Sequence, residues 1–81
     1  MLPDMGKSSG LRAQVWGRHI KAARAQRGWT LDRLAGRLDV THQTVSRWEH
    51  GKPPRLDHCF DLAGVLGVPF DDLFPMLDDR R

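Results

Sequence analysis

Apolar residues recur along this chain at helical spacing, in successive segments separated by glycine, threonine or proline. In residues 11–27, Trp16, Ile20 and Ala23 fall at i, i+4 and i+7. In the next segment, residues 31–38, the spacing is i, i+3, i+4 and i+7. Its apolar residues are Leu31, Leu34, Ala35 and Leu38. Such spacing gives a helix one apolar face for burial, so each segment predicts a short amphipathic helix.

A third helix is expected between Thr41 and Gly51. The hydroxyl of Thr41 can accept a backbone N–H at a helix start, and Gly51 can end the helix in the left-handed conformation. Val45 and Trp48, at i and i+3, supply a narrow apolar face. The opposite face carries side chains that donate or accept hydrogen bonds: His42, Gln43, Thr44 and Arg47. Base edges in the DNA major groove present patterns that such side chains can match.

The second and third helices are joined very tightly. Only Asp39 and Val40 separate the last apolar residue of the second helix from Thr41, so the chain must turn sharply there, as in a helix-turn-helix. Gly36, inside the second helix, indicates either close packing or simple tolerance of glycine at that position.

Two further helices are predicted beyond the consecutive prolines Pro53 and Pro54, which exclude a helix in their own segment. A fourth helix is expected before Gly67, and a short fifth from Pro69 to about Phe74. The apolar face expected for the fourth helix consists of Leu56, Cys59, Phe60, Ala63 and Leu66. No segment has the alternating pattern of a strand.

These elements predict an all-α fold of five short helices, in one helix-turn-helix domain over residues 11–75. Residues 1–10 show no helical periodicity and are expected to form a flexible N-terminal arm. Residues 76–81 form a C-terminal tail that is either a frayed end or a dimer contact. A chain of 81 residues can bury one small core, which is consistent with a single domain.

The net charge of +3 is unevenly distributed along the chain. Residues 1–55 hold 11 Lys and Arg against four acidic residues, a balance of +7, whereas residues 56–81 have a balance of −4. A phosphate backbone would be attracted to the basic side of such a molecule. Uneven charge is also found on plain solvated surfaces, so the distribution alone does not decide the function.

Composition argues against several other classes of protein. The single cysteine, Cys59, allows no intramolecular disulfide, and no apolar run approaches the roughly 20 residues of a membrane span, so we expect a cytoplasmic protein. The four histidines and Cys59 lack the spacing of a metal site. Neither a phosphate-binding glycine loop nor an activated nucleophile is evident. We therefore expect no enzyme activity, no cofactor and no bound metal.

The order and spacing of these residues resemble the Cro/CI-type helix-turn-helix of the Xre family of repressors, over residues 16–74. The matching residues are Ile20, Trp29-Thr30-Leu31, Leu34-Ala35, Leu38-Asp39-Val40-Thr41, Val45-Ser46, Trp48-Glu49, Gly51-Lys52, Leu62-Ala63, Leu66-Gly67-Val68 and Leu73-Phe74. The resemblance implies a compact five-helix, lambda-repressor-like domain. Such domains usually bind double-stranded DNA as dimers, with the third helix in the major groove.

The resemblance also assigns roles to individual residues. Base-reading positions fall on His42, Gln43, Thr44 and Arg47. Phosphate contacts fall on Thr41, Lys52 and Arg55. A basic residue of the first helix pairs with an acid of the third, here Arg24 with Glu49, and Arg24 could still face a phosphate.

Some of these positions can also be explained without a contact to DNA. A solvated histidine at a helix start is nearly as good an interpretation of His42 as a base or phosphate contact, and Thr44 could be plain helix surface. Trp16, near the edge of the match, belongs either to the core or to an interface. Three positions depart from the family pattern: Leu31 replaces a common glutamine, Asp39 a common glycine and Arg55 a Ser or Thr cap.

The sequence therefore predicts a sequence-specific regulator of transcription, a repressor or Cro-like protein that binds an inverted-repeat operator as a homodimer. The alternative is an antitoxin-like or anti-regulator module that binds a protein partner, such as a toxin, through its acidic fourth and fifth helices and Met76-Leu77. A third interpretation is the DNA-binding half of a system whose effector domain lies on another chain. No small-molecule ligand and no membrane association are expected.

Overall fold

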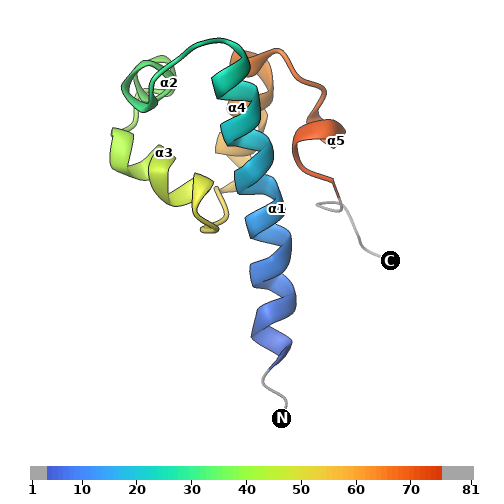
Figure 1. The fold of residues 1–81 in the computed structure, drawn as a ribbon. Helices are drawn as coiled ribbons and strands as arrows, with labels where there is room; N and C mark the ends of the chain where they lie inside the picture. The colour runs from blue at the N-terminus through green and yellow to red at the C-terminus, as the bar shows by residue number, and fades with distance from the viewer. Residues whose placement is uncertain (1–3, 76–81) are drawn as a thin grey trace.

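The computed structural model describes the backbone of residues 4–75 and the side chains of residues 10–75. This part of the chain is all-helical, as predicted, and contains no strand (Figure 1). The five helices are α1 (Asp4–Gln26), α2 (Leu31–Leu38), α3 (His42–Glu49), α4 (Leu56–Leu66) and α5 (Phe70–Leu73). None of these described helices is both long enough and apolar enough to span a membrane. The C-terminal tail, residues 76–81, lies outside the described residues.

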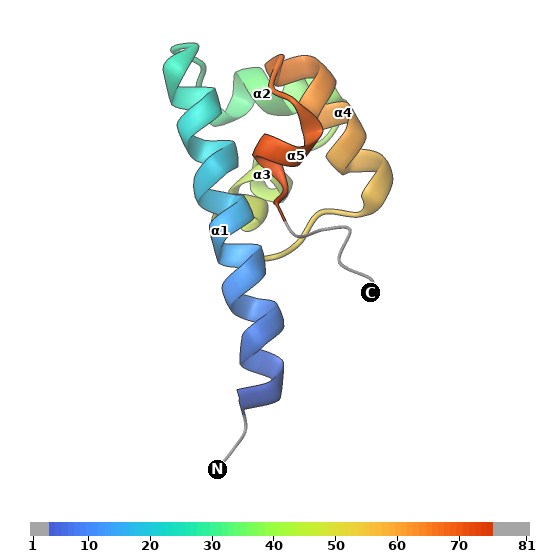
Figure 2. The ribbon, with the colours of Figure 1, turned by 90° about the vertical axis from the view of Figure 1, so that its right-hand side faces the viewer.

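Helix α1 is longer than predicted. The periodicity indicates a start near Leu11, but the helix begins at Asp4, so the expectation of an irregular arm is wrong for residues 4–10. Figures 1 and 2 show the N-terminal half of α1 projecting beyond the other helices. Apolar periodicity reports only the part of a helix that packs against a core. A nucleated helix can extend further, because each added residue gains a hydrogen bond without a new nucleus.

The ends of the helices follow local signals in the sequence. The hydroxyl of Thr30 accepts the backbone N–H of Arg33 at 3.1 Å. Gly28 and Gly67 adopt the left-handed conformation, with φ of 68° and 69°, beyond the ends of α1 and α4. The backbone thus turns without steric cost at the positions where glycine allows it.

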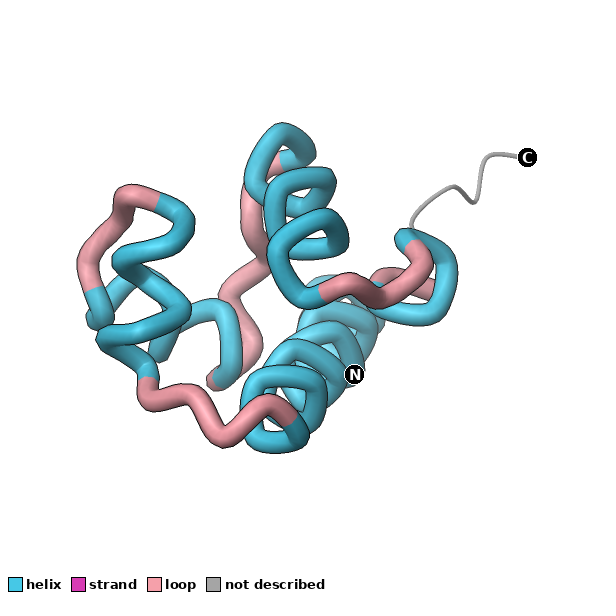
Figure 3. Tube along the Cα trace, turned by 90° about the horizontal axis from the view of Figure 1, so that it is seen from above, coloured by secondary structure: helices cyan, strands magenta, loops and turns pink. Residues whose placement is uncertain are grey.

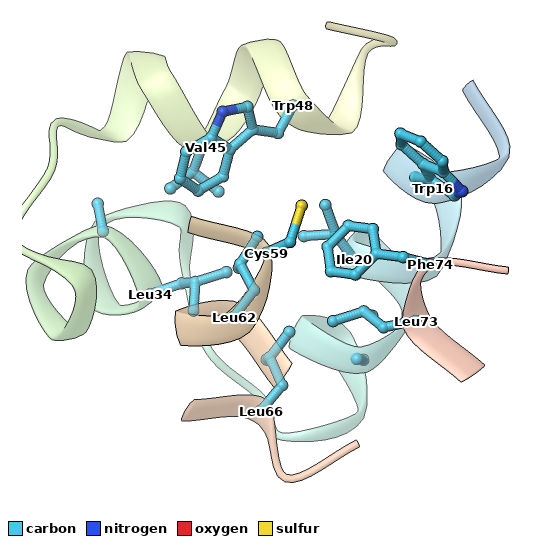
Figure 4. Packing of buried hydrophobic residues seen from close by; sticks show 12 residues of the cluster. Trp16, Ile20, Leu34, Val45, Trp48, Cys59, Leu62, Leu66, Leu73 and Phe74 are labelled. Carbon is cyan, nitrogen blue, oxygen red and sulfur yellow. The ribbon is translucent and has the colours of Figure 1, made fainter. Parts of the chain in front are cut away.

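The core lies among the five helices: α3 packs against α1 and α2, and α4 and α5 pack against each other and against α1. Figure 4 shows Val45 and Trp48 of α3 directed toward side chains of the other helices. The buried cluster consists of Trp16, Ile20, Ala23, Leu34, Ala35, Val45, Trp48, Cys59, Leu62, Leu66, Leu73 and Phe74. The apolar faces predicted for α1 and α3 are buried, and so are Leu34 and Ala35 of α2.

The face predicted for α4 is wrong in part. Cys59 and Leu66 are buried, but the third buried residue of this helix is Leu62, whereas Leu56 and Phe60 are 57% and 58% exposed. Apolar residues surround much of α4, so their spacing fits more than one face. Packing against the neighbouring helices selects the face that carries Leu62. The ring of Phe60 instead stacks on Phe70 of α5, with centroids 4.6 Å apart.

Trp16 belongs to the core rather than to an exposed interface. Its side chain is 7% exposed, and its ring meets Phe74 edge-to-face at 5.8 Å. The indole N–H donates to the carbonyl oxygen of Pro75 at 2.8 Å. Trp16 therefore fastens the end of α5 to α1, with its apolar ring buried and its single polar atom satisfied.

Candidate nucleic-acid interface

The turn between α2 and α3 sets the direction of α3. Asp39 adopts the left-handed conformation, with φ of 59°, and the next residue, Val40, donates its N–H to the carbonyl oxygen of Ala35 at 3.0 Å. Asp tolerates this conformation better than most residues, as the sequence indicates. Figure 3 shows the short loop and the change of direction that it produces between the two helices.

Helix α3 has a buried back and a polar front. Val45 is fully buried and Trp48 is 4% exposed. The four residues expected to read bases lie away from this apolar back: His42, Gln43 and Arg47 are exposed and Thr44 is half-buried. The hydroxyl of Thr44 lies 2.9 Å from the hydroxyl of Thr41, which also accepts the backbone N–H of Thr44 at 3.2 Å.

An ion pair ties the end of α3 to α1. Arg24 donates from Nε to Oε2 of Glu49 at 2.7 Å and from Nη2 to Oε1 at 3.0 Å. Its remaining terminal nitrogen, Nη1, donates to the carbonyl oxygen of Trp29 at 2.8 Å. The hydrogen bonds to Glu49 raise the pKa of Arg24, while burial opposes the rise. Three of the five N–H groups of the guanidinium are thus used within the protein, which gives Arg24 a structural role and leaves two N–H groups that a phosphate could use.

A close backbone approach supports the same junction. A Cβ atom added at Gly17 of α1 would lie 2.5 Å from the carbonyl oxygen of Trp48 and 2.8 Å from that of Glu49. Glycine is therefore required for α1 to pass this close to the end of α3. In the sequence, Gly17 is marked only as a glycine beside the apolar stripe of a helix, where alanine would have the higher helix propensity.

A basic cleft of about 220 Å³ lies between α3 and the start of α4. Arg47, Lys52 and Arg55 line it, together with His58. The ring of His58 packs at 5.1 Å against that of Trp48. The structure thus brings one expected base contact together with two expected phosphate contacts. It adds His58, which the sequence analysis left unassigned.

Arg55 has an acidic partner in the first turn of α4. Its Nη2 donates to Oδ2 of Asp57 at 2.9 Å, and its Nε to Oδ1 at 3.3 Å. This hydrogen bonding lowers the pKa of Asp57 and raises that of Arg55. Arg55 makes no side-chain hydrogen bond as a cap of α4, as expected when Ser or Thr is replaced. A phosphate at this position would compete with Asp57 for the guanidinium.

A second acid lies against the start of α3 from α2. Oδ1 of Asp32 lies 3.3 Å from Nδ1 of His42, the first residue of α3. Asp32 lies in the first turn of α2, near the positive end of that helix. The contact depends on the α2–α3 turn, which brings the starts of the two helices together.

The described residues include no group of three or more His, Cys, Asp or Glu side chains that could hold a metal ion. Cys59 is buried, and its Sγ lies 3.7 Å from the carbonyl oxygen of Pro54. Burial raises the pKa of this thiol to about 11, so Cys59 remains protonated at neutral pH. Because the thiolate is the nucleophilic form, Cys59 is unsuited to nucleophilic chemistry.

Comparison with known proteins agrees with this geometry. A family of helix-turn-helix domains matches residues 20–73. An HTH-type transcriptional regulatory protein of Halorubrum lacusprofundi is 33% identical over 85% of this chain. The match covers only 21% of that longer protein.

Two shorter relatives match over almost their whole length. Both are named as uncharacterized HTH-type transcriptional regulators. The one from Bacillus subtilis is 32% identical over 80% of this chain and 96% of its own length. The one from Methanocaldococcus jannaschii is 37% identical over 75% of this chain and 94% of its own length. With its five-helix fold and its helix-turn-helix, this chain belongs to the Xre, Cro/CI-type family of helix-turn-helix transcriptional regulators.

Proposed function

We propose that this protein is a sequence-specific regulator of transcription that inserts α3 into the major groove of double-stranded DNA in the cytoplasm. The observation that carries the proposal is the two-sided character of α3. Its back is fixed by buried apolar residues and the Arg24–Glu49 pair, and its front is polar and exposed. A helix held in this way can present side chains to base edges in a fixed orientation.

Base recognition is assigned to the front of α3. Arg47 can donate two hydrogen bonds to O6 and N7 of guanine, and the amide of Gln43 can pair with adenine. His42 contributes a ring nitrogen. The hydroxyl of Thr44 lies beside that of Thr41, which also accepts the backbone N–H of Thr44. The methyl group is therefore the part of the Thr44 side chain that can contact thymine.

Phosphate contacts are assigned to residues around the front of α3. Thr41 stands at the start of α3, where backbone N–H groups attract anions. Lys52 and Arg55 line the basic cleft and can fix the register of the protein on the duplex without reading sequence. Arg24 is assigned first to the structural ion pair, since three of its five N–H groups are directed to Glu49 and Trp29, and the other two can face a phosphate.

The protein is proposed to act as a repressor that binds an inverted repeat as a homodimer. Half-sites about 34 Å apart would match one turn of the double helix. Self-association through this side would cover the exposed ring of Phe60, which stacks on Phe70, and covering apolar surface is favourable.

A protein-interaction module is the second candidate, and the same surface favours it. Phe60 lies at the edge of a hollow of about 430 Å³ between the end of α2 and the middle of α4. Arg37 and Asp61 also line this hollow, so a partner protein would find apolar and charged groups together. An antitoxin-like protein would bind its partner here.

The deciding experiment is selection of bound fragments from sheared genomic DNA of the source organism at about 150 mM salt. Enrichment of a short inverted repeat supports the regulator. Retention of fragments without a shared motif contradicts sequence-specific recognition, because phosphate contacts alone give binding without sequence preference. No retention favours the interaction module.

A further inference from the structure

An acidic residue stands at the edge of the surface assigned to DNA. Asp32, in the first turn of α2, is 83% exposed and lies beside His42, which is 54% exposed. A carboxylate near a phosphate backbone weakens association. Asp32 is also not needed as the cap of α2, since the hydroxyl of Thr30 fulfils that role. An acid in the first turn also interacts favourably with the positive end of α2, and the contact with His42 offers a second role that acts through the histidine.

The contact determines how the imidazole is used. Oδ1 of Asp32 is 3.3 Å from Nδ1 of His42. An ionised carboxylate attracts an N–H group and repels a nitrogen lone pair, so this close contact favours the tautomer with the proton on Nδ1. In a neutral imidazole the other nitrogen, Nε2, is then a hydrogen-bond acceptor. The side chain of His42 would approach DNA with an acceptor rather than a donor.

In the major groove the donors on base edges are the exocyclic amines of adenine and cytosine. Guanine presents N7 and O6 there, and thymine presents O4, all of which are acceptors. An Nε2 acceptor therefore gains a hydrogen bond from adenine or cytosine and meets another acceptor on guanine or thymine. The Asp32 contact thus bears on which bases His42 can read.

We propose that Asp32 is a positioning residue for base recognition, which holds His42 in the tautomer that reads adenine or cytosine. This inference rests on the proposed DNA-binding function and deepens it, because it names the base class for one position of the operator. Asp32 itself makes no contact with DNA in this arrangement. It acts through the ring of His42.

The test compares four proteins on a library of random duplexes: wild type, Asp32→Ala, His42→Ala and the double variant. The operator position read by His42 is the one where His42→Ala loses preference. We expect wild type to prefer adenine or cytosine there, and Asp32→Ala to reduce that preference about three- to ten-fold, the range of one hydrogen bond. In the His42→Ala background the Asp32 substitution should leave the preference unchanged, because the two residues act as a unit.

Asp71→Ala is the matched control. Asp71 is another exposed acid in the first turn of a helix, α5, so its removal changes the net charge equally. If the loss of charge alone mattered, both substitutions would raise affinity for all duplexes and leave base preference intact. That result would overturn the inference. A wild-type preference for guanine or thymine at the His42 position would also overturn it.

A measurement without DNA separates this inference from the proposed function. The nitrogen chemical shifts of the His42 ring, read by NMR at about pH 8, report its tautomer. We expect the Nδ1–H form to predominate in wild type and to decline in Asp32→Ala. A predominant Nε2–H form overturns the inference even if the protein selects an operator. If wild type selects no operator, the proposed function fails, and the base preference inferred here fails with it, whatever the NMR result.

Discussion

The part of the molecule that holds α3 differs in construction from the part formed by α4 and α5. Helix α3 is joined to α1 by the Arg24–Glu49 ion pair, by the close backbone contact at Gly17 and by buried side chains. Helices α4 and α5 lack side-chain caps at their starts and leave Phe60 and Leu56 exposed. The bidentate ion pair thus lies at the junction of α3 with α1. The α5 end is instead fastened to α1 by single hydrogen-bond contacts to backbone carbonyl oxygens, from Trp16 to Pro75 and between His19 and Leu73.

The largest effect on stability is expected from Glu49→Ala. The substitution leaves Arg24, whose side chain is only 15% exposed, without its bidentate acceptor. We expect the free energy of unfolding to fall by about 2–3 kcal/mol, since hydrogen bonds to charged groups are the stronger ones. Chemical denaturation measures this loss. A loss no greater than that of an exposed substitution such as Asp71→Ala would contradict the importance of the pair.

Gly17→Ala should be nearly as damaging. The added methyl group would meet the carbonyl oxygens of Trp48 and Glu49, so α1 and α3 would have to separate. We expect a loss of about 1–3 kcal/mol, as for other overpacked sites. Gly64→Ala is the control, because nothing lies within 4 Å of its added methyl group. It should be neutral or should stabilise the protein by up to about 1 kcal/mol. Equal effects of the two substitutions would refute the close-approach argument.

Arg47→Ala tests the proposed base-reading face of α3 without altering the buried face of the helix. Because Arg47 is exposed, stability should change by no more than about 0.5 kcal/mol. Specific affinity should fall by about 1–3 kcal/mol, with relaxed preference at one base pair. Lys52→Ala is the matched comparison. It should weaken binding to all DNA sequences alike and reduce the slope of the salt dependence of binding by about 0.9. If Arg47→Ala weakens binding to specific and to random DNA equally, Arg47 contacts phosphate rather than a base.

Phe60→Ser tests the α4–α5 side. Phe60 is 58% exposed, so its removal should cost less stability than either change at the α1–α3 junction. If two copies meet through this surface, sedimentation should show weaker self-association and titration weaker binding to an inverted repeat. Binding to a single half-site should be unaffected. An unchanged oligomeric state on the inverted repeat would place the dimer contact elsewhere.

The smallest effect is expected at Asp57. Its hydrogen bonds with Arg55 lower its pKa, so the stabilising interaction is complete above the ordinary carboxyl pKa of about 3.9. The interaction is lost as the pH falls through the lowered value. In NMR titration, Arg55→Ala should return the Asp57 pKa toward 3.9. A pKa unchanged by this substitution would mean that the ion pair does not persist in solution.

The sequence by itself determined the parts of the fold that depend on neighbouring residues. Thr30 and Thr41 cap their helices through hydrogen bonds three residues away, and Asp39 takes up the left-handed turn. The apolar back of α3 was also readable, because only Val45 and Trp48 fit one face of a short polar helix. The Arg24–Glu49 pair came from family resemblance rather than from local pattern. The base-reading and phosphate roles remain proposals.

Only the tertiary structure decided features that join distant segments. Trp16 bonds to Pro75, 59 residues away, and Gly17 lies against the end of α3. Asp32 meets His42 through the turn, and α4 buries Leu62 rather than Phe60. Periodicity states that a helix has an apolar face. Where apolar residues surround most of a helix, the face that is buried depends on the shape of the neighbouring helices, which no local pattern contains.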